Sequence, residues 1–186
     1  MKYCYFPGCS LEASAVAYAQ SIQAITNELG IELVELEDWN CCGTSPYSSV
    51  DELLACCVSA RNLALAEKSG LDLVTACSSC YRTLGKTNEL LKQYPELKKE
   101  VDEALAAGGL EYHGRVKVRH LADVLLRDVG PEAIAAKVKR KLDGLGGRFT
   151  TAARSFAPRA SSTTPSSPNR WTGWWRASAL RLSPSR

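Results

Sequence analysis

Apolar residues in the first 143 positions follow two periods, and segments of each period alternate along the chain. Short apolar or alternating runs bounded by turn residues predict strands at Lys2–Phe6, Ile31–Leu36, Leu71–Ala76 and Val116–Arg119. Longer runs with a helical period predict helices at Leu11–Leu29, Asp51–Ser69, Tyr81–Tyr94, Pro95–Ala107, Leu121–Val129 and Pro131–Leu142. Ser10 is expected to cap the first helix, because serine side chains accept from first-turn amides.

Strands that alternate with helices of this length predict an α/β fold, with a Rossmann-like parallel sheet and helices on both faces. Cysteines follow the carboxyl ends of three predicted strands, at Cys9, at Cys41 and Cys42, and at Cys77 and Cys80. In an open α/β sheet these ends lie along one edge, where the ligand crevice forms. We therefore expect three loops that are far apart in sequence to bring their cysteines to one place.

Eight cysteines make thiol chemistry the leading interpretation of the composition. The sequence begins without an apolar signal core and contains no run of 18 apolar residues, so we expect a cytoplasmic protein without a membrane span. In such a reducing compartment cysteines stay free to act as metal ligands or redox groups. Structural disulfides are not expected.

The net charge of +3 averages two unlike segments. Residues 1–143 hold all 20 acidic residues and 16 of the 23 lysines and arginines, whereas the last 43 residues hold seven arginines and no acidic residue. Nucleic-acid binding would depend on that last segment alone, and we do not expect it. Lys137–Lys141 is expected to be a solvated helix face, with a docking patch for an acidic partner as the alternative.

The spacing of five cysteines favours a metal centre. Cys9 is followed by 31 residues, the adjacent pair Cys41 and Cys42, 34 further residues, and then Cys77 and Cys80, which are two residues apart. Thiolates are the ligands that zinc and iron–sulfur clusters select. A Cys-x-x-Cys loop alone is equally typical of zinc, of a redox dithiol and of a cluster. An adjacent pair, however, suits a cluster with several irons better than one tetrahedral zinc.

This pattern, with Gly43 after the adjacent pair, resembles the CCG domain of the heterodisulfide reductase B-type subunit and related proteins. The segments Tyr5–Ser10 and Ser59–Ala64 also resemble that family, and the resemblance covers about residues 1–143. It implies a non-cubane 4Fe-4S cluster bound by five thiolates, those of Cys9, Cys41, Cys42, Cys77 and Cys80.

The same resemblance implies an iron–sulfur subunit that passes electrons to a disulfide such as CoM-S-S-CoB. Its partners would be the ferredoxin-like and flavin subunits of a heterodisulfide reductase, subunits C and A. In the family two CCG domains face each other, and this chain carries one set of cysteines, so we expect the chain alone to be inactive. A structural zinc-binding domain and a metal-free thiol oxidoreductase remain the alternatives.

The other cysteines and both histidines are expected to have structural roles. Cys56 and Cys57 lie in the middle of a predicted helix and are expected to be buried as small apolar residues. Cys4 is expected to pack in the core close to the cysteine site, with a ligand role as the alternative. His113 and His120 are expected to be surface or capping residues.

Residues 144–186 show no hydrophobic period, which predicts a disordered basic tail. Arginine without lysine, together with proline, serine and tryptophan, is typical of GC-rich DNA read out of frame. Residues 149–158, back-translated and read one base earlier, give a Gly-Cys similar to the start of a CCG domain. We hypothesise that the tail is an out-of-frame remnant of a second such domain; a restored frame without a second cysteine set would refute this.

Overall fold

The structure is a computed structural model that describes residues 1–44, 47, 49–139, 146–147 and 181–182. The chain divides into two units, Met1–Ala122 and Asp123–Arg186. All five cysteines of the predicted centre lie in the first unit.

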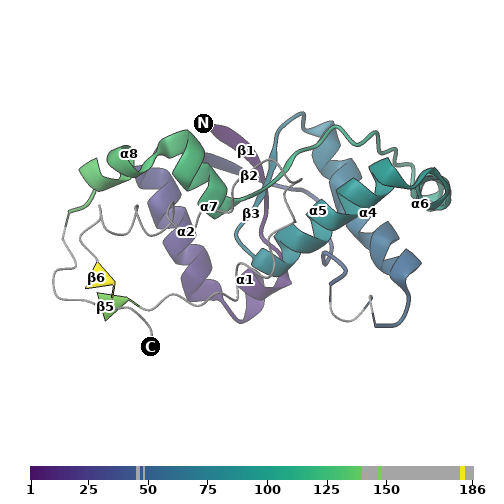
Figure 1. The fold of residues 1–186 in the computed structure, drawn as a ribbon, viewed down its shortest axis with the longest axis horizontal. Coiled ribbons are helices and arrows are strands. Elements are labelled where there is room, and N and C mark those ends of the chain that lie inside the picture. Colours follow the sequence, from purple (N-terminus) through teal and green to yellow (C-terminus); the bar gives the residue numbers. More distant parts are fainter. Residues whose placement is uncertain (45–46, 48, 140–145, 148–180, 183–186) are drawn as a thin grey trace. The chain divides into compact units, whose positions relative to one another are not determined.

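The first unit is built on a parallel sheet, as the alternation of strands and helices predicted (Figure 1). Its strands are β1 (Lys2–Phe6), β2 (Glu32–Glu35), β3 (Leu73–Thr75) and β4 (Val118–His120), in the order β2-β1-β3-β4. Every adjacent pair is parallel, and Cys4 in β1 is level with Val34 in β2 and Leu73 in β3. The α/β fold class is therefore confirmed.

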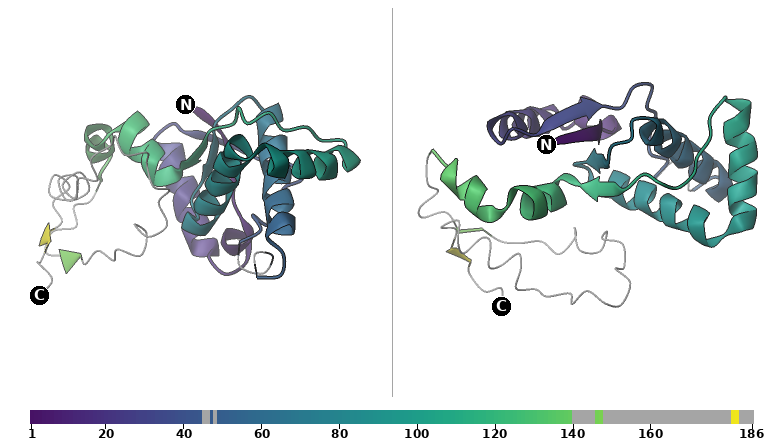
Figure 2. Two further views of the ribbon diagram at one scale, coloured as in Figure 1. Left: turned by 45° about the vertical axis from the view of Figure 1, so that its right-hand side comes forward. Right: turned by 90° about the horizontal axis from the view of Figure 1, so that it is seen from above.

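Helices cover both faces of the sheet (Figures 1 and 2). One side carries α1 (Cys9–Ala13) and α2 (Val16–Glu28), and the other carries α4 (Glu52–Lys68), α5 (Ser78–Gln93) and α6 (Pro95–Ala107). This division follows from the strand order, because a right-handed crossover from β1 to β2 and one from β2 back to β3 lie on opposite faces. The helices α4, α5 and α6 all pack on one another.

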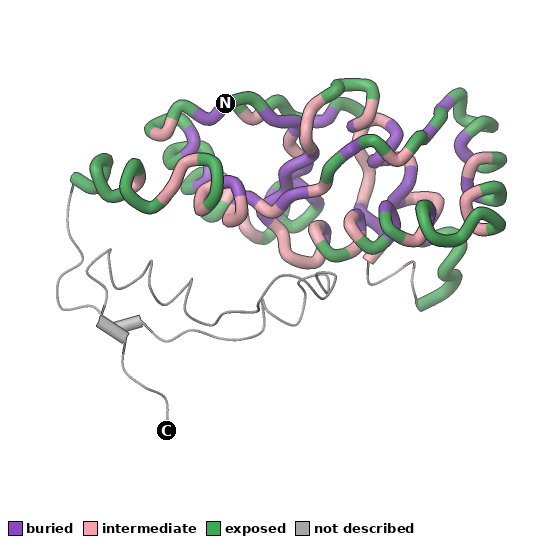
Figure 3. Tube along the Cα trace, turned by 45° about the horizontal axis from the view of Figure 1, so that its top comes forward, coloured by how far each residue is buried: buried purple, intermediate pink, exposed green. Residues whose placement is uncertain are grey.

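The core lies between the sheet and the layer formed by α4, α5 and α6. In the sheet, buried residues are most frequent in the central strands β1 and β3 (Figure 3). Phe6 in β1, Leu63 in α4, Leu73 in β3 and Leu84 in α5 are fully buried. Each such side chain contributes about 1.5–3 kcal/mol of hydrophobic free energy on folding. This packing fixes the helices that carry the cysteine loops.

The start of the first helix differs from the sequence prediction. Gly8 precedes the helix with φ 78°, and Ser10 lies inside α1, so the prediction of Ser10 as the cap was wrong. A glycine tolerates this positive φ and lets the chain turn directly from β1 into a helix that begins at Cys9. The predicted Leu11–Leu29 helix is also divided, because α1 ends at Ala13 and α2 begins at Val16.

The later helices are shorter or less regular than predicted. The segment Leu121–Val129 consists of α7 (Leu121–Val124) followed by the π-helix η1 (Leu125–Val129), and α8 spans Pro131–Ala136. In the second unit β5 (Gly146–Gly147) pairs in parallel with β6 (Arg181–Leu182). The predictions for residues 140–145 and for most of the tail lie outside the described residues.

Candidate functional site

The cysteine edge, which we define as Cys9, Cys41, Cys42, Cys77 and Cys80, lies at the carboxyl ends of three strands. Its first loop is very short: β1 ends at Phe6, and Cys9 is already the first residue of α1. A Cβ atom added to Gly8 would lie 2.9 Å from the sulfur of Cys80. The loop after β1 therefore packs directly on the Cys77–Cys80 segment.

The second loop follows β2 and is held by α4. Phe6 packs edge-on against Trp39, with ring centroids 5.4 Å apart. Gly43 has φ 83°, and a Cβ there would lie 2.8 Å from the carbonyl oxygen of Ala55. The close approach of this loop to the helix thus requires glycine after the cysteine pair.

The third loop leads from β3 into α5. Cys77 immediately precedes the helix and Cys80 lies in its first turn. Both sulfurs are thereby placed at a helix amino terminus, where free backbone amides and the helix dipole favour negative charge. The hydroxyl of Tyr18, from α2 on the other face of the sheet, donates to the carbonyl of Ala76 just before this turn at 3.4 Å.

The five thiols form one continuous group. Cys9 is hydrogen-bonded to Cys41, Cys41 to Cys42, Cys42 to Cys80, and Cys80 to Cys77. Burial is greatest in the middle of the group: Cys42 and Cys80 are buried, Cys41 and Cys77 are partly buried, and Cys9 is exposed. The structure thus brings together all five cysteines that the sequence analysis selected.

The thiols differ in acidity because they accept and donate different hydrogen bonds. The Cys80 thiol and the amides of Cys80 and Ser79 lower the pKa of Cys77 to about 5, against an opposing effect of burial. The Cys80 thiol and the Thr44 amide lower the pKa of Cys42 to about 7. The pKa of Cys80 is raised, because its one thiol proton is held between the sulfurs of Cys42 and Cys77 and the group is buried. Burial also raises the pKa of Cys41.

Two tyrosines border the thiols. Burial, with the neighbouring Tyr18, Glu35, Cys77 and Cys80, raises the pKa of Tyr5 to about 12. Burial and Cys77 also raise the pKa of Tyr18. Both phenols therefore stay protonated at neutral pH, and the Tyr18 hydroxyl donates to the Ala76 carbonyl next to Cys77.

The types of donor atom fit a sulfur-rich metal centre, whereas their spacing in this structure is that of thiols hydrogen-bonded to one another. Five adjacent thiols, two of them acidified, are the soft ligands that iron–sulfur clusters use. In the described part of the chain no group of three or more histidine, cysteine or acidic side chains is arranged to hold a metal ion, and the thiols contact one another.

Among the described residues Asn40 Oδ1 and Ser59 Oγ are buried without a hydrogen-bond partner, and Asn40 immediately precedes the cysteine pair.

Sequence reasoning placed Asn62, a fully buried residue of α4, in the Ser59–Ala64 segment that resembles the family but assigned it no role. Its side chain accepts a hydrogen bond from the Asn40 amide at 3.0 Å and donates to the carbonyls of Asn40 and Cys41 at 3.1 and 3.3 Å. Besides that resemblance, the signal was an asparagine on the apolar face of a predicted helix, since a buried polar side chain normally satisfies specific partners.

The remaining cysteines are not part of the hydrogen-bonded group of thiols. Cys4 is buried in the core, as predicted, but its thiol is hydrogen-bonded to Ser69, which precedes β3 and so lies toward the opposite edge of the sheet. Cys4 belongs to the same buried core cluster as Cys42 and Cys80, and its expected place close to the site stays a prediction. Cys56 is buried and Cys57 is partly buried in α4, so the prediction for the pair holds in full only for Cys56.

Both histidines have the structural roles that were predicted. His113 is half-exposed, and its amide and ring contact the carboxylate of Glu67. His120 ends β4, and its Nδ1 accepts from the amide of Ala122 at 3.1 Å, which caps the first turn of α7.

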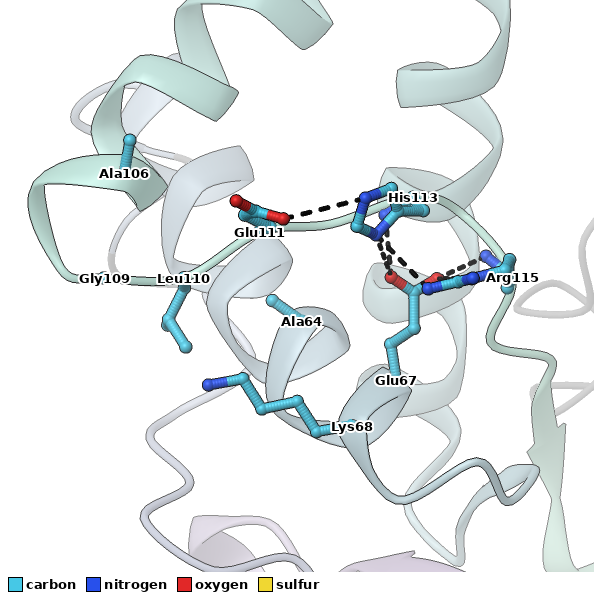
Figure 4. A pocket seen from close by; sticks show the side chains of 9 residues that line it. All are labelled: Ala64, Glu67, Lys68, Ala106, Gly109, Leu110, Glu111, His113 and Arg115. Atoms are coloured by element: carbon cyan, nitrogen blue, oxygen red, sulfur yellow. Dashed lines mark hydrogen bonds and ion pairs between the residues drawn. The ribbon is translucent and has the colours of Figure 1, made fainter.

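A cavity of about 400 Å³ lies at the amino edge of the sheet, on the loops that lead into β3 and β4 (Figure 4). We call it the Glu67 pocket; its lining consists of Ala64, Glu67, Lys68, Ala106, Gly109, Leu110, Glu111, His113 and Arg115. The Glu67 carboxylate accepts from the amides of His113 at 2.7 Å and Arg115 at 2.5 Å. Burial raises the pKa of Glu67, but these amides outweigh that effect and lower it.

Residues 3–85 match the family model of the CCG cysteine-rich domain, and the chain belongs to the family of the heterodisulfide reductase B-type subunit. It is 43% identical over 148 residues to a protein of Archaeoglobus profundus that is named as like this B-type subunit, covering 78% of this chain and 49% of that protein. It is 29% identical over 143 residues to the B-type subunit of the ferredoxin/F420H2-dependent CoB-CoM heterodisulfide reductase of Methanosarcina acetivorans, covering 76% and 48%.

A second kind of relative is the 8-methylmenaquinol:fumarate reductase membrane anchor subunit of Wolinella succinogenes, 37% identical over 171 residues, covering 89% of this chain and 59% of that protein. The chain thus spans about half the length of the curated relatives it matches. A crystal structure of a hypothetical protein from Helicobacter pylori has the same fold, with a TM-score of 0.72, 18% identity, and coverage of 100% of this chain and 33% of that one. Within the described residues, no helix has both the length and the apolar character needed to cross a bilayer.

Proposed function

Because residues 3–85 form a CCG cysteine-rich domain and most of the chain is homologous to the heterodisulfide reductase B-type subunit, we propose that it is the iron–sulfur subunit of a heterodisulfide reductase-type oxidoreductase. The observation that carries the proposal is the continuous contact of five thiols at one edge of the sheet. In this proposal all five are ligands of a non-cubane 4Fe-4S cluster.

The chain's own residues prepare the site for an anionic centre. The amides of Gly43 and Thr44 interact with the sulfurs of Cys41 and Cys42, and those of Ser79 and Cys80 with the sulfur of Cys77. Such amides stabilise thiolate and sulfide charge. A bound cluster would supply one-electron transfer. Exposed Cys9 would lie on the solvent side, where an electron donor or a substrate can approach.

The proposed substrate is a disulfide, CoM-S-S-CoB or an analogue, with a quinone-linked path as the other route that the relatives' names suggest. Cleavage of a disulfide requires two electrons. Since this chain carries one set of five cysteines, it is expected to be inactive by itself and to act with ferredoxin-like and flavin subunits of the C and A types. We place the complex in the cytoplasm.

A metal-free thiol oxidoreductase is the second candidate, and the low pKa of Cys77 favours it. A Cys77 thiolate could attack a disulfide sulfur and release one thiol. Cys80 would then displace the second thiol and leave a disulfide between Cys77 and Cys80. This route needs only two of the five cysteines.

The test is anaerobic purification of the full chain, followed by iron and sulfide analysis and EPR of the oxidised sample. We expect about four irons per chain. Cys41→Ser and Cys42→Ser should each change the signal and the iron content, whereas Cys56→Ser, the matched control in the core, should change neither. Stoichiometric zinc without iron would place the chain among structural zinc domains. No metal, with turnover that depends only on Cys77 and Cys80, would favour the second candidate.

A further inference from the structure

The loop that carries Cys41 and Cys42 is irregular, yet its backbone at residues 40 and 41 is held by one side chain. Asn62 is fully buried in α4, 22 residues from Asn40. Its Oδ1 accepts from the Asn40 amide, and its Nδ2 donates to the Asn40 and Cys41 carbonyls. A side-chain amide thus pairs with this loop as a neighbouring strand would, using both its acceptor and its donors.

Because of these hydrogen bonds, the carbonyls and the amides of the loop have different partners. The carbonyls of Asn40 and Cys41 are directed to the helix, where Asn62 satisfies them. The next amides, of Gly43 and Thr44, are left to interact with the sulfurs of Cys41 and Cys42. Carbonyl oxygens that faced the sulfurs would repel a thiolate or a cluster, whereas amides attract it.

We infer that Asn62 is the positioning residue of the cysteine pair: it turns the loop carbonyls away from the sulfurs and the loop amides toward them. The inference rests on the proposed function in so far as the bound group is an iron–sulfur cluster. Hydrogen bonds to the sulfurs set the reduction potential of such clusters. Asn62 would therefore adjust the cluster through the loop without contacting it.

The structure also offers a matched control in Asn88. This buried residue of α5 accepts from the Tyr112 hydroxyl at 2.6 Å and donates to the Val116 carbonyl at 2.9 Å. Both asparagines therefore use one acceptor and at least one donor in the core, but the partners of Asn88 lie on the loop before β4. Replacement of either residue by aspartate keeps an acceptor, removes the donor and places a carboxylate oxygen against a carbonyl.

The first experiment follows hydrogen exchange of the full apo chain. In the wild type the Asn40 amide should exchange slowly although it lies outside helices and strands. In Asn62→Asp, and in the uncharged variant Asn62→Ser, residues 40–44 should exchange at least about tenfold faster. Asn88→Asp should instead affect residues 112–116. A rapidly exchanging Asn40 amide in the wild type would overturn the inference. Because this measurement uses the wild-type chain, it does not depend on whether the variants fold.

The second experiment uses the anaerobically loaded chain. Asn62→Asp should lose iron to a chelator about tenfold faster than the wild type, with an altered EPR signal and a more negative midpoint potential. Asn88→Asp should keep the wild-type signal. Equal changes in both variants would show a general loss of stability and overturn the positioning role. A wild type without iron would refute the proposed function alone, and the exchange pattern would then decide the role of Asn62.

Discussion

At the carboxyl edge of the sheet five thiols are hydrogen-bonded mainly to one another, whereas at the amino edge the Glu67 carboxylate is enclosed by backbone amides. A cavity, the Glu67 pocket, lies at the amino edge (Figure 4). Its carboxylate already accepts from His113 and Arg115 through short, charge-assisted bonds. The thiols have only weak S–H donors between them.

This difference shows that the Glu67 pocket and the group of thiols are chemically distinct sites at opposite edges of the sheet. Charge-assisted N–H···O bonds are worth about 1.5–3 kcal/mol each, so Glu67 has little to gain from a ligand and ties the 111–115 loop to α4. Bonds between thiols are weak and can be exchanged for bonds to a metal at low cost. In our proposal the reactive part of the molecule is therefore the cysteine edge and not the Glu67 pocket, and the following changes test that contrast.

The largest effect is expected for Gly43→Ala. A Cβ at this position meets the Ala55 carbonyl oxygen at 2.8 Å, and φ 83° is itself strained for alanine. We expect a loss of roughly 2–4 kcal/mol in urea unfolding, with loss of bound iron. Gly30→Ala is the control, because Gly30 has φ 67° with nothing within 4 Å and should cost only about 1–2 kcal/mol. Equal losses would argue against close packing of the cysteine loop on α4.

Glu67→Gln should weaken the fold without affecting the cysteine edge. Glutamine offers one oxygen to two amides, so either the His113 or the Arg115 amide loses its partner. We expect a loss of about 1–3 kcal/mol in urea unfolding and an unchanged iron content. The control is Glu111→Gln, whose side chain is 85% exposed and 3.8 Å from His113, and which should change stability by less than about 0.5 kcal/mol. Loss of iron in Glu67→Gln would show that the two edges are coupled.

The contribution of Glu67 should also depend on pH. Its pKa in the folded protein is below the ordinary value of 4.5, so it stabilises the fold above that value, and this is lost as the pH falls through the lowered pKa. The stability difference between wild type and Glu67→Gln should be constant above about pH 6 and shrink toward about pH 3. Urea unfolding at a series of pH values measures it. A difference that grows in acid would contradict the direction of this pKa shift.

Arg61→Lys should have the smallest effect. The Arg61 guanidinium bonds the carbonyl of Asp38 at 2.6 Å and its carboxylate at 2.5 Å, and a lysine ammonium cannot reproduce this fork. Because Asp38 is largely exposed, we expect a loss of only about 0.5–1 kcal/mol, with faster hydrogen exchange confined to residues 38–42. Arg127→Lys, whose partner Asp123 lies one turn earlier, should leave that exchange unchanged. Unaltered exchange in Arg61→Lys would assign the hold on this loop to Asn62 alone.

The sequence by itself determined the alternation of strands and helices and, through it, the place of the cysteines. Cys9, the pair at 41 and 42, and the Cys77–Cys80 loop each follow an apolar run, and parallel strands align their carboxyl ends. Hydrophobic periodicity depends only on the local sequence, so it predicts strands and helices without knowledge of their tertiary contacts. It was less reliable at the helix ends: the positive φ of Gly8 made Ser10 part of the helix that it was expected to cap.

Only the tertiary structure decided which thiols touch and what holds their loops. The strand order brings Cys42 and Cys77 to the same Cys80, although 34 residues separate the first two. It also directs Cys4 toward Ser69, pairs Asn62 with a loop 22 residues earlier and encloses Glu67 with amides 46 and 48 residues later. Such partners share no sequence period, because they meet only after the sheet and its helices have packed.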